Sequence, residues 1–175
     1  MISNHRNPVY NQNLNPVYNH SINPIYNRNL NPIYNRALSP IYNRALNPIY
    51  NRSLNPIYNH AINPIYNRSI NPIYNHSINL TYNNSINPIY NNDIPGLYIF
   101  DKSNKLVEFS VYASEDYMII YNYETKKQVN YAVKNELDGY IIFDMQNRVV
   151  GQYVEDPNNG FVIFEGTSNW IGNAN

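Results

Sequence analysis

An eight-residue repeat restricts how this 175-residue chain can fold more than any other feature of its sequence. From Asn7 to Ile94 the chain consists of eleven octads of the form Asn-Pro-Ile-Tyr-Asn-Arg-Ser-Leu. Position four is always tyrosine, position five is always asparagine, position eight is Leu or Ile, and position two is proline except at Leu80. A continuous α-helix is excluded, because a proline in every octad would cost about 3 kcal/mol each time.

Asn-Pro-x-Tyr is typical of a type I turn, in which proline presets the backbone and the asparagine side chain caps the turn. The asparagine at position five tolerates a left-handed conformation, and the residues up to position eight would form an extended arm. Two octads would form one flattened coil, and coils would stack about 4.7–4.8 Å apart like strands in a sheet. We therefore expect an all-β octapeptide-repeat β-solenoid with two octads per coil. A disordered tract and short helical turns at the Asn-Pro positions are the alternatives.

A second, longer repeat follows Pro95. The aromatic residues Phe100, Tyr121, Phe143 and Phe164 recur at intervals of 21, 22 and 21 residues, each within an apolar segment that precedes a polar turn. Enrichment in β-branched and aromatic residues at this spacing predicts four hairpins in an antiparallel sheet or small barrel. The expected organisation is an N-terminal tail over 1–6, the octads over 7–94 and a small antiparallel β-hairpin-repeat domain over 95–175.

The net charge of zero conceals two oppositely charged halves. Residues 1–92 contain six arginines and no acid, whereas residues 93–175 contain all twelve acids against one arginine and five lysines. Such asymmetry indicates an anionic partner or contact between the halves. The solenoid would also leave its first coil as an open edge, and an open edge templates pairing with another copy.

Position six carries most of the positive charge of the octads. Arginine there, interleaved with tyrosine, could contact the phosphates and stack on the bases of a nucleic acid, or bind an acidic polysaccharide. In a sixteen-residue coil these side chains would alternate between two faces, and a solvated charged edge is the plainer interpretation. The candidate binding residues are Arg28, Arg36, Arg44, Arg52, Arg68, His20, His60, His76, Tyr26, Tyr34, Tyr42 and Tyr50.

Catalytic chemistry has little support in the sequence. There is no cysteine, and residues 93–175 contain no histidine, so the usual nucleophile–base pairs are missing there. We expect no enzyme activity, no cofactor, no metal site and no small-molecule substrate. No apolar run is long enough for a membrane span, and the N-terminus lacks the apolar core of a signal peptide. The expected location is cytoplasmic, or outside the cell by a non-classical route.

Two resemblances bear on function. Each segment such as Asn23-Pro24-Ile25-Tyr26 resembles the Asn-Pro-x-Tyr ligand of phosphotyrosine-binding and endocytic adaptor domains, which implies an effector-like scaffold with many tyrosine motifs. The recurring Ser-Ile-Asn-Pro phrases, followed by units such as Phe143-Asp144-Met145-Gln146-Asn147, resemble uncharacterised bacterial octapeptide-repeat proteins of the Bacteroidetes type. That second resemblance covers nearly the whole chain and implies a bacterial origin, with no particular activity.

The leading functional hypothesis is a non-enzymatic structural or interaction protein that presents a regular Tyr/Asn/Arg surface. It would self-associate, into oligomers or filaments, through its basic octads and its acidic C-terminal half. A polyanion-binding module and the tyrosine-motif scaffold are the alternatives.

Overall fold

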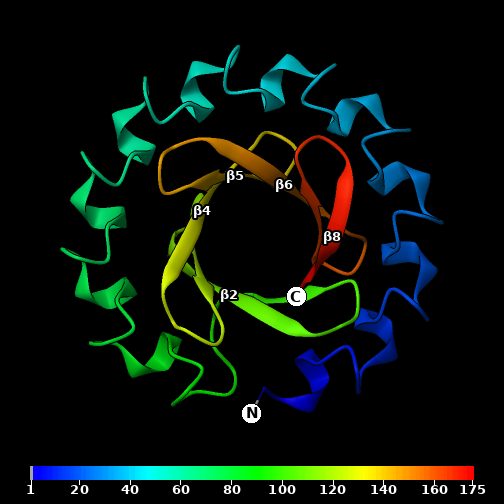
Figure 1. The fold of residues 1–175 in the computed structure, drawn as a ribbon, viewed down its shortest axis with the longest axis horizontal. Coiled ribbons are helices and arrows are strands. Elements are labelled where there is room, and N and C mark those ends of the chain that lie inside the picture. Colours follow the sequence, from blue (N-terminus) through cyan, green and yellow to red (C-terminus); the bar gives the residue numbers. More distant parts are fainter. Residues whose placement is uncertain (1) are drawn as a thin grey trace.

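A closed belt of octads surrounds a β-barrel in the computed structural model, which describes residues 2–175 (Figure 1). Met1, the first residue of the expected N-terminal tail, lies outside the described residues. Eight antiparallel strands form the barrel in chain order, β1 next to β8. They are β1 (Tyr98–Asp101), β2 (Leu106–Ser114), β3 (Tyr117–Asn122), β4 (Gln128–Lys134), β5 (Tyr140–Asp144), β6 (Val149–Glu155), β7 (Phe161–Glu165) and β8 (Asn169–Ala174).

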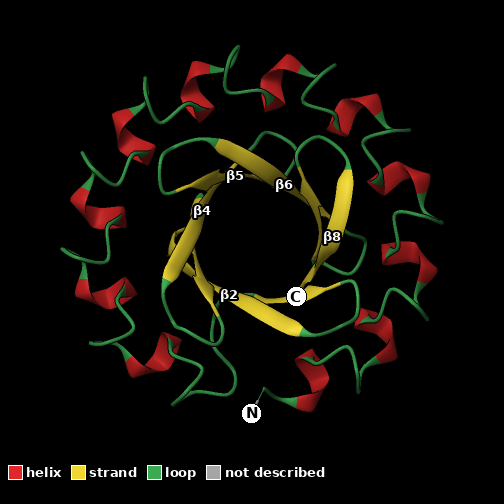
Figure 2. Cartoon of the chain, in the orientation of Figure 1, coloured by secondary structure: helices red, strands yellow, loops and turns green. Residues whose placement is uncertain are grey.

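The belt is built from short 3-10 helices, one after another around the barrel (Figure 2). Each octad has an Asn-Pro-Ile-Tyr turn in which the tyrosine N–H donates to the carbonyl of the first residue, as in Tyr26 to Asn23 at 3.0 Å. The helices are η1 (Asn4–Arg6), η2 (Gln12–Leu14), η3 (His20–Ile22), η4 (Arg28–Leu30), η5 (Arg36–Leu38), η6 (Arg44–Leu46), η7 (Arg52–Leu54), η8 (His60–Ile62), η9 (Arg68–Ile70), η10 (His76–Ile78) and η11 (Asn84–Ile86).

The predicted β-solenoid is therefore wrong, and so is the added hairpin domain. Positions six to eight are helical, not extended, because the asparagine at position five acts as an N-cap. Asn27, for example, has φ −94° and ψ 93°, and its side chain accepts from the backbone N–H of Asn29. This is extended backbone and not the left-handed conformation that we expected at position five. A cap of this kind stabilises the start of a helical turn by about 0.5–2 kcal/mol.

Asparagine side chains connect each octad to the one before it. At position one, the Asn63 Oδ1 accepts from the Ile65 N–H at 2.9 Å while its Nδ2 donates to the Pro56 carbonyl at 2.9 Å. At position five, the Asn67 Nδ2 donates to the Ala61 carbonyl at 2.6 Å. Each amide group thus closes a local turn and spans one octad, so a single octad suffices as the repeating unit. The sixteen-residue coil is not needed.

The belt explains why the odd-numbered barrel strands, β1, β3, β5 and β7, are apolar at every position but the last. Segments such as Tyr117–Tyr121 are buried at every position, which is expected only where both faces of a sheet are covered. The face outside the barrel, with Phe109, Tyr121 and Tyr131, forms one core with Leu46, Ile78 and other position-eight residues of the belt. The opposite face lines the barrel interior. The octads and the hairpins therefore share a core.

Barrel side chains also hydrogen-bond to the belt backbone. The carbonyl at position eight accepts from a barrel side chain in three octads. Tyr121 donates to the Ile78 carbonyl at 3.1 Å, and Gln152 donates to the Leu38 carbonyl at 2.9 Å. Such bonds determine how the belt is seated around the barrel, because buried carbonyls are costly to leave unpaired.

Arg6 joins the two ends of the belt. It occupies the last position of the short turn η1, where the octads have Leu or Ile, and so faces the barrel. Its guanidinium donates to the carbonyls of Ile94 (2.6 Å), Gly96 (2.5 Å) and Asn175 (2.8 Å) and lies over the Tyr98 ring. The nearby Ser3 N–H donates to the Asn92 carbonyl at 3.4 Å.

Ring closure removes the open solenoid edge on which we based the expectation of filaments. The first residues of the chain are also part of the belt rather than a tail, since Ile2 belongs to the shared core. Within residues 2–175, no helix is long and apolar enough to cross a membrane.

Candidate functional site

The outer surface of the belt exposes an unusual amount of apolar side chain. The Asn-Pro-Ile-Tyr turns project away from the barrel (Figure 2). The Val or Ile side chains at position three are 61–78% exposed, and the tyrosines at position four are 56–68% exposed. We call the exposed side chains at positions three, four and six the rim. Because exposed apolar patches of this extent are rare on soluble proteins, the rim is the first candidate site.

Position-six side chains stack on the tyrosine of the next octad. The Arg28 guanidinium lies 4.8 Å from the centroid of the Tyr34 ring, and the same contact joins Arg36 to Tyr42, Arg44 to Tyr50, Arg52 to Tyr58 and Arg68 to Tyr74 at 4.9–5.0 Å. Histidine stacks in the same place, with centroids 4.0–4.1 Å apart, in His20 on Tyr26, His60 on Tyr66 and His76 on Tyr82. Stacking orients each cation, because a guanidinium over a ring keeps its N–H groups free at the edge.

All twelve predicted binding residues therefore lie on the rim, as members of such pairs. One detail of the prediction is wrong. The position-six residues do not alternate between two faces, because successive octads are equivalent. His60 and His76 each stack on a different tyrosine. In the described part of the chain, no group of three His, Cys, Asp or Glu side chains could hold a metal ion.

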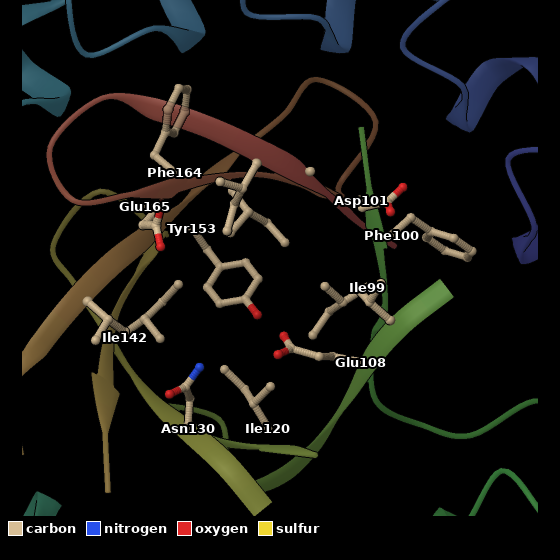
Figure 3. Close-up of a pocket in the computed structure, with 15 residues that line it drawn as sticks. Ile99, Phe100, Asp101, Glu108, Ile120, Asn130, Ile142, Tyr153, Phe164 and Glu165 are labelled. Atoms are coloured by element: carbon tan, nitrogen blue, oxygen red, sulfur yellow. The ribbon is translucent and has the colours of Figure 1, made fainter. Parts of the chain in front are cut away.

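A second candidate site lies inside the barrel, in a cavity of about 460 Å³ (Figure 3). Four isoleucines, one from each hairpin, form a ring around it, and each is paired with a residue of the following strand. The pairs are Ile99–Glu108, Ile120–Asn130, Ile142–Gly151 and Ile163–Gly172. A β-bulge follows the isoleucine in all four hairpins. All four repeats therefore contribute an isoleucine to the ring. Their partner residues differ, because two are polar (Glu108 and Asn130) and two are glycines.

The end of the barrel beneath this ring is closed by aromatic residues. Tyr140, Tyr153 and Phe161 pack edge to face, with centroids 5.6–6.5 Å apart. Tyr153 is 1% exposed and its hydroxyl points toward the Glu108 carboxyl group (Figure 3). Asp101, Glu165 and Ile171 lie at the other, more exposed end of the cavity. The cavity is thus closed at one end by aromatic residues and acidic at its open end, where Asp101 and Glu165 lie. We call this cavity the cup.

Burial raises the pKa of two groups in the cup, the Glu108 carboxyl group and the Tyr153 hydroxyl group. Loss of hydration raises the pKa of the Glu108 carboxyl group. Burial, and secondarily the charge of Glu108, raises the pKa of the Tyr153 hydroxyl, which therefore remains a hydrogen-bond donor. Neither side chain makes a hydrogen bond to another protein group within residues 2–175.

The cup was not predicted from the sequence. A signal was present, because the four repeat units can be aligned on Phe100, Tyr121, Phe143 and Phe164. That alignment places Glu108 where the last two units have glycine, and Asn130 one residue further along in the second unit, which is one residue longer. In a single strand, however, Glu108 resembles an ordinary exposed residue between apolar neighbours.

Comparison with protein-family models, with curated proteins and with solved structures finds no match to this chain.

Proposed function

We propose that this protein is a non-enzymatic interaction protein whose rim binds an extended polyanion. The observation that carries the proposal is the set of five arginines at position six, four of them in successive octads, each held over an exposed tyrosine. Residues 2–92 contain no acid that would neutralise them or repel an anionic ligand. Phosphate, sulfate and carboxylate groups at regular spacing would each be met by oriented N–H donors.

The exposed tyrosine and isoleucine side chains favour a polymer that also offers flat or apolar surface. A single-stranded nucleic acid and a sulfated or uronic-acid polysaccharide both have this chemistry. The adaptor-ligand alternative has less support, because the Asn-Pro-x-Tyr asparagines are used inside the belt. Asn23 accepts from Ile25 and donates to the Pro16 carbonyl, so its amide is not free for a reader domain.

Replacing Arg28, Arg36, Arg44, Arg52 and Arg68 together with glutamine is expected to lower polyanion affinity by more than 100-fold at low salt. Glutamine is tolerated at position six, since Gln12 occupies it in the first octad. For single-stranded nucleic acid, the slope of log K against log salt should fall by up to about 3.5, or about 0.7 for each arginine replaced. Fluorescence anisotropy with a labelled DNA oligonucleotide and with labelled heparin measures both quantities and separates the two polymer classes.

Arg148→Gln is the matched control, because Arg148 lies in the β5–β6 turn, away from the rim, and pairs with Asp144 at 2.7 Å. It removes a charge without touching a stacked pair, so the affinity should stay within about twofold of the parent. The proposal fails if the parent protein binds neither polymer, or if the fivefold variant binds both as tightly as the parent.

Self-association has separate support in the distribution of charge. The exposed acids Glu115, Glu124, Glu136 and Asp138 lie in the turns at the ends of the barrel, whereas the arginines lie on the rim. Rim-to-end contacts between copies would therefore be attractive and screened by salt. Sedimentation velocity at low and high salt tests this second candidate, since the fivefold glutamine variant should remain monomeric at low salt.

A further inference from the structure

We propose that the cup inside the barrel binds a small organic ammonium ion, with a compact apolar body among the isoleucines and its charge against Glu108. This site is separate from the rim and does not depend on the proposed polyanion binding.

The shape and size of the cup suit a small molecule. Its volume of about 460 Å³ lies within the range of known ligand sites, and its walls are largely apolar with few polar groups. Four isoleucines, namely Ile99, Ile120, Ile142 and Ile163, supply the apolar surface. A barrel of eight strands has an interior wide enough either for packed side chains or for one small ligand. At Gly172, which lines the cavity, a Cβ would lie 2.0 Å from the Phe100 carbonyl oxygen of the neighbouring strand, so no side chain from that position enters the space.

The charge of the cup selects a cation. Glu108, Asp101 and Glu165 are the charged residues among those lining the cavity, and no lysine, arginine or histidine of the described chain is among them. Tyr153 faces Glu108 from the opposite wall and Asn130 lies on the strand after next (Figure 3). A carboxylate held in apolar surroundings without a cationic partner is costly, and a bound cation would remove that cost.

The same groups argue for an organic cation over a metal ion. Calcium and magnesium require six or more oxygen ligands, which the isoleucine ring cannot provide. An ammonium group has three N–H donors, and Glu108 and Tyr153 turn their oxygens toward the centre of the cup, with the Asn130 side-chain amide beside them. The alkyl or aryl body would then occupy the space between the isoleucines.

Isothermal titration of the full chain with n-alkylamines from butylamine to octylamine tests this proposal, with n-alkanols of equal length as neutral controls. At pH 8 we expect the best amine to bind at least tenfold more tightly than the matching alcohol. Glu108→Gln should remove that preference by weakening amine binding at least tenfold, with alcohol binding unchanged. Glu124→Gln, at an exposed acid of the β3–β4 turn, is the control and should behave as the parent protein.

The pH dependence provides a second readout that needs no variant. Binding requires the ionised carboxylate, so amine affinity should rise as pH increases through the raised pKa of Glu108 and then reach a plateau. It should fall only near pH 10, where an alkylammonium loses its proton. The other titratable groups that line the cavity with Glu108 are Asp101, Glu165 and Tyr153, and the two acids would strengthen the same trend. Equal affinity for amines and alcohols, or no binding of any amine, would overturn the proposal.

Discussion

Phe109→Ala is expected to lower the free energy of unfolding by about 3–5 kcal/mol, because it creates a cavity where the barrel and the belt share their core. The Phe109 ring is 0% exposed and stacks on the Tyr121 ring with centroids 5.5 Å apart. Tyr121 in turn donates to the Ile78 carbonyl of the belt at 3.1 Å. The substitution therefore weakens both layers together.

Urea unfolding followed by circular dichroism and by the fluorescence of Trp170 measures this effect. Trp170 packs in one cluster with Leu30 and Leu38 of the belt, so its signal reports contact between the layers. Both signals should change in one shared transition, shifted to lower urea in the variant. Val149→Ala, at a residue that is 48% exposed on β6, should change the free energy of unfolding by about 0.5 kcal/mol or less. A loss below about 1 kcal/mol for Phe109→Ala would contradict a shared core.

Arg6→Met is expected to destabilise the protein by about 3 kcal/mol, since it leaves the carbonyls of Ile94, Gly96 and Asn175 without their charged donor. Hydrogen bonds to charged groups contribute about 1.5–3 kcal/mol each, and water will replace part of this loss. Methionine keeps much of the length of the side chain, so the missing guanidinium dominates. Arg6→Lys should restore only part of the stability, because an ammonium cannot match three diverging acceptors.

Arg52→Met is the matched control for Arg6→Met. Arg52 lies over the Tyr58 ring at 5.0 Å on the exposed rim, and an exposed cation–π contact contributes about 0.5–1 kcal/mol. Chemical denaturation of the two variants should therefore separate them clearly. Similar losses would mean that Arg6 does not join the ends of the belt.

The local turn at Asn-Pro-Ile-Tyr could be predicted from the octad, but the path of the chain could not. Proline and asparagine have strong local preferences, and the Asn23–Tyr26 turn follows from them. Asn27 can adopt a left-handed conformation or cap a helix, and its own sequence does not decide between them. The capped 3-10 turn is favoured because Leu30 can then reach the barrel, which is a contact with residues more than a hundred positions away.

The strands also show that contacts between distant parts of the chain could not be predicted from local sequence. Tyr117–Tyr121 was recognisable as a buried strand, yet its two apolar faces required a second covering layer that the octads supply. The rim residues were predictable, because charge and tyrosine recur at fixed positions of a repeat. Glu108 was not, since its position inside the barrel depends on register and closure.

Distances between octads decide whether the belt is closed. The chain has no cysteine, so spin labels can be placed at Asn13→Cys with Ser53→Cys, and at Asn13→Cys with Ser85→Cys. All three sites are exposed at position seven, in octads one, six and ten. Double electron–electron resonance spectroscopy should give a shorter distance between the labels at 13 and 85 than between those at 13 and 53, because the ends of a ring meet. A longer distance for 13–85 would show an open array and contradict the belt.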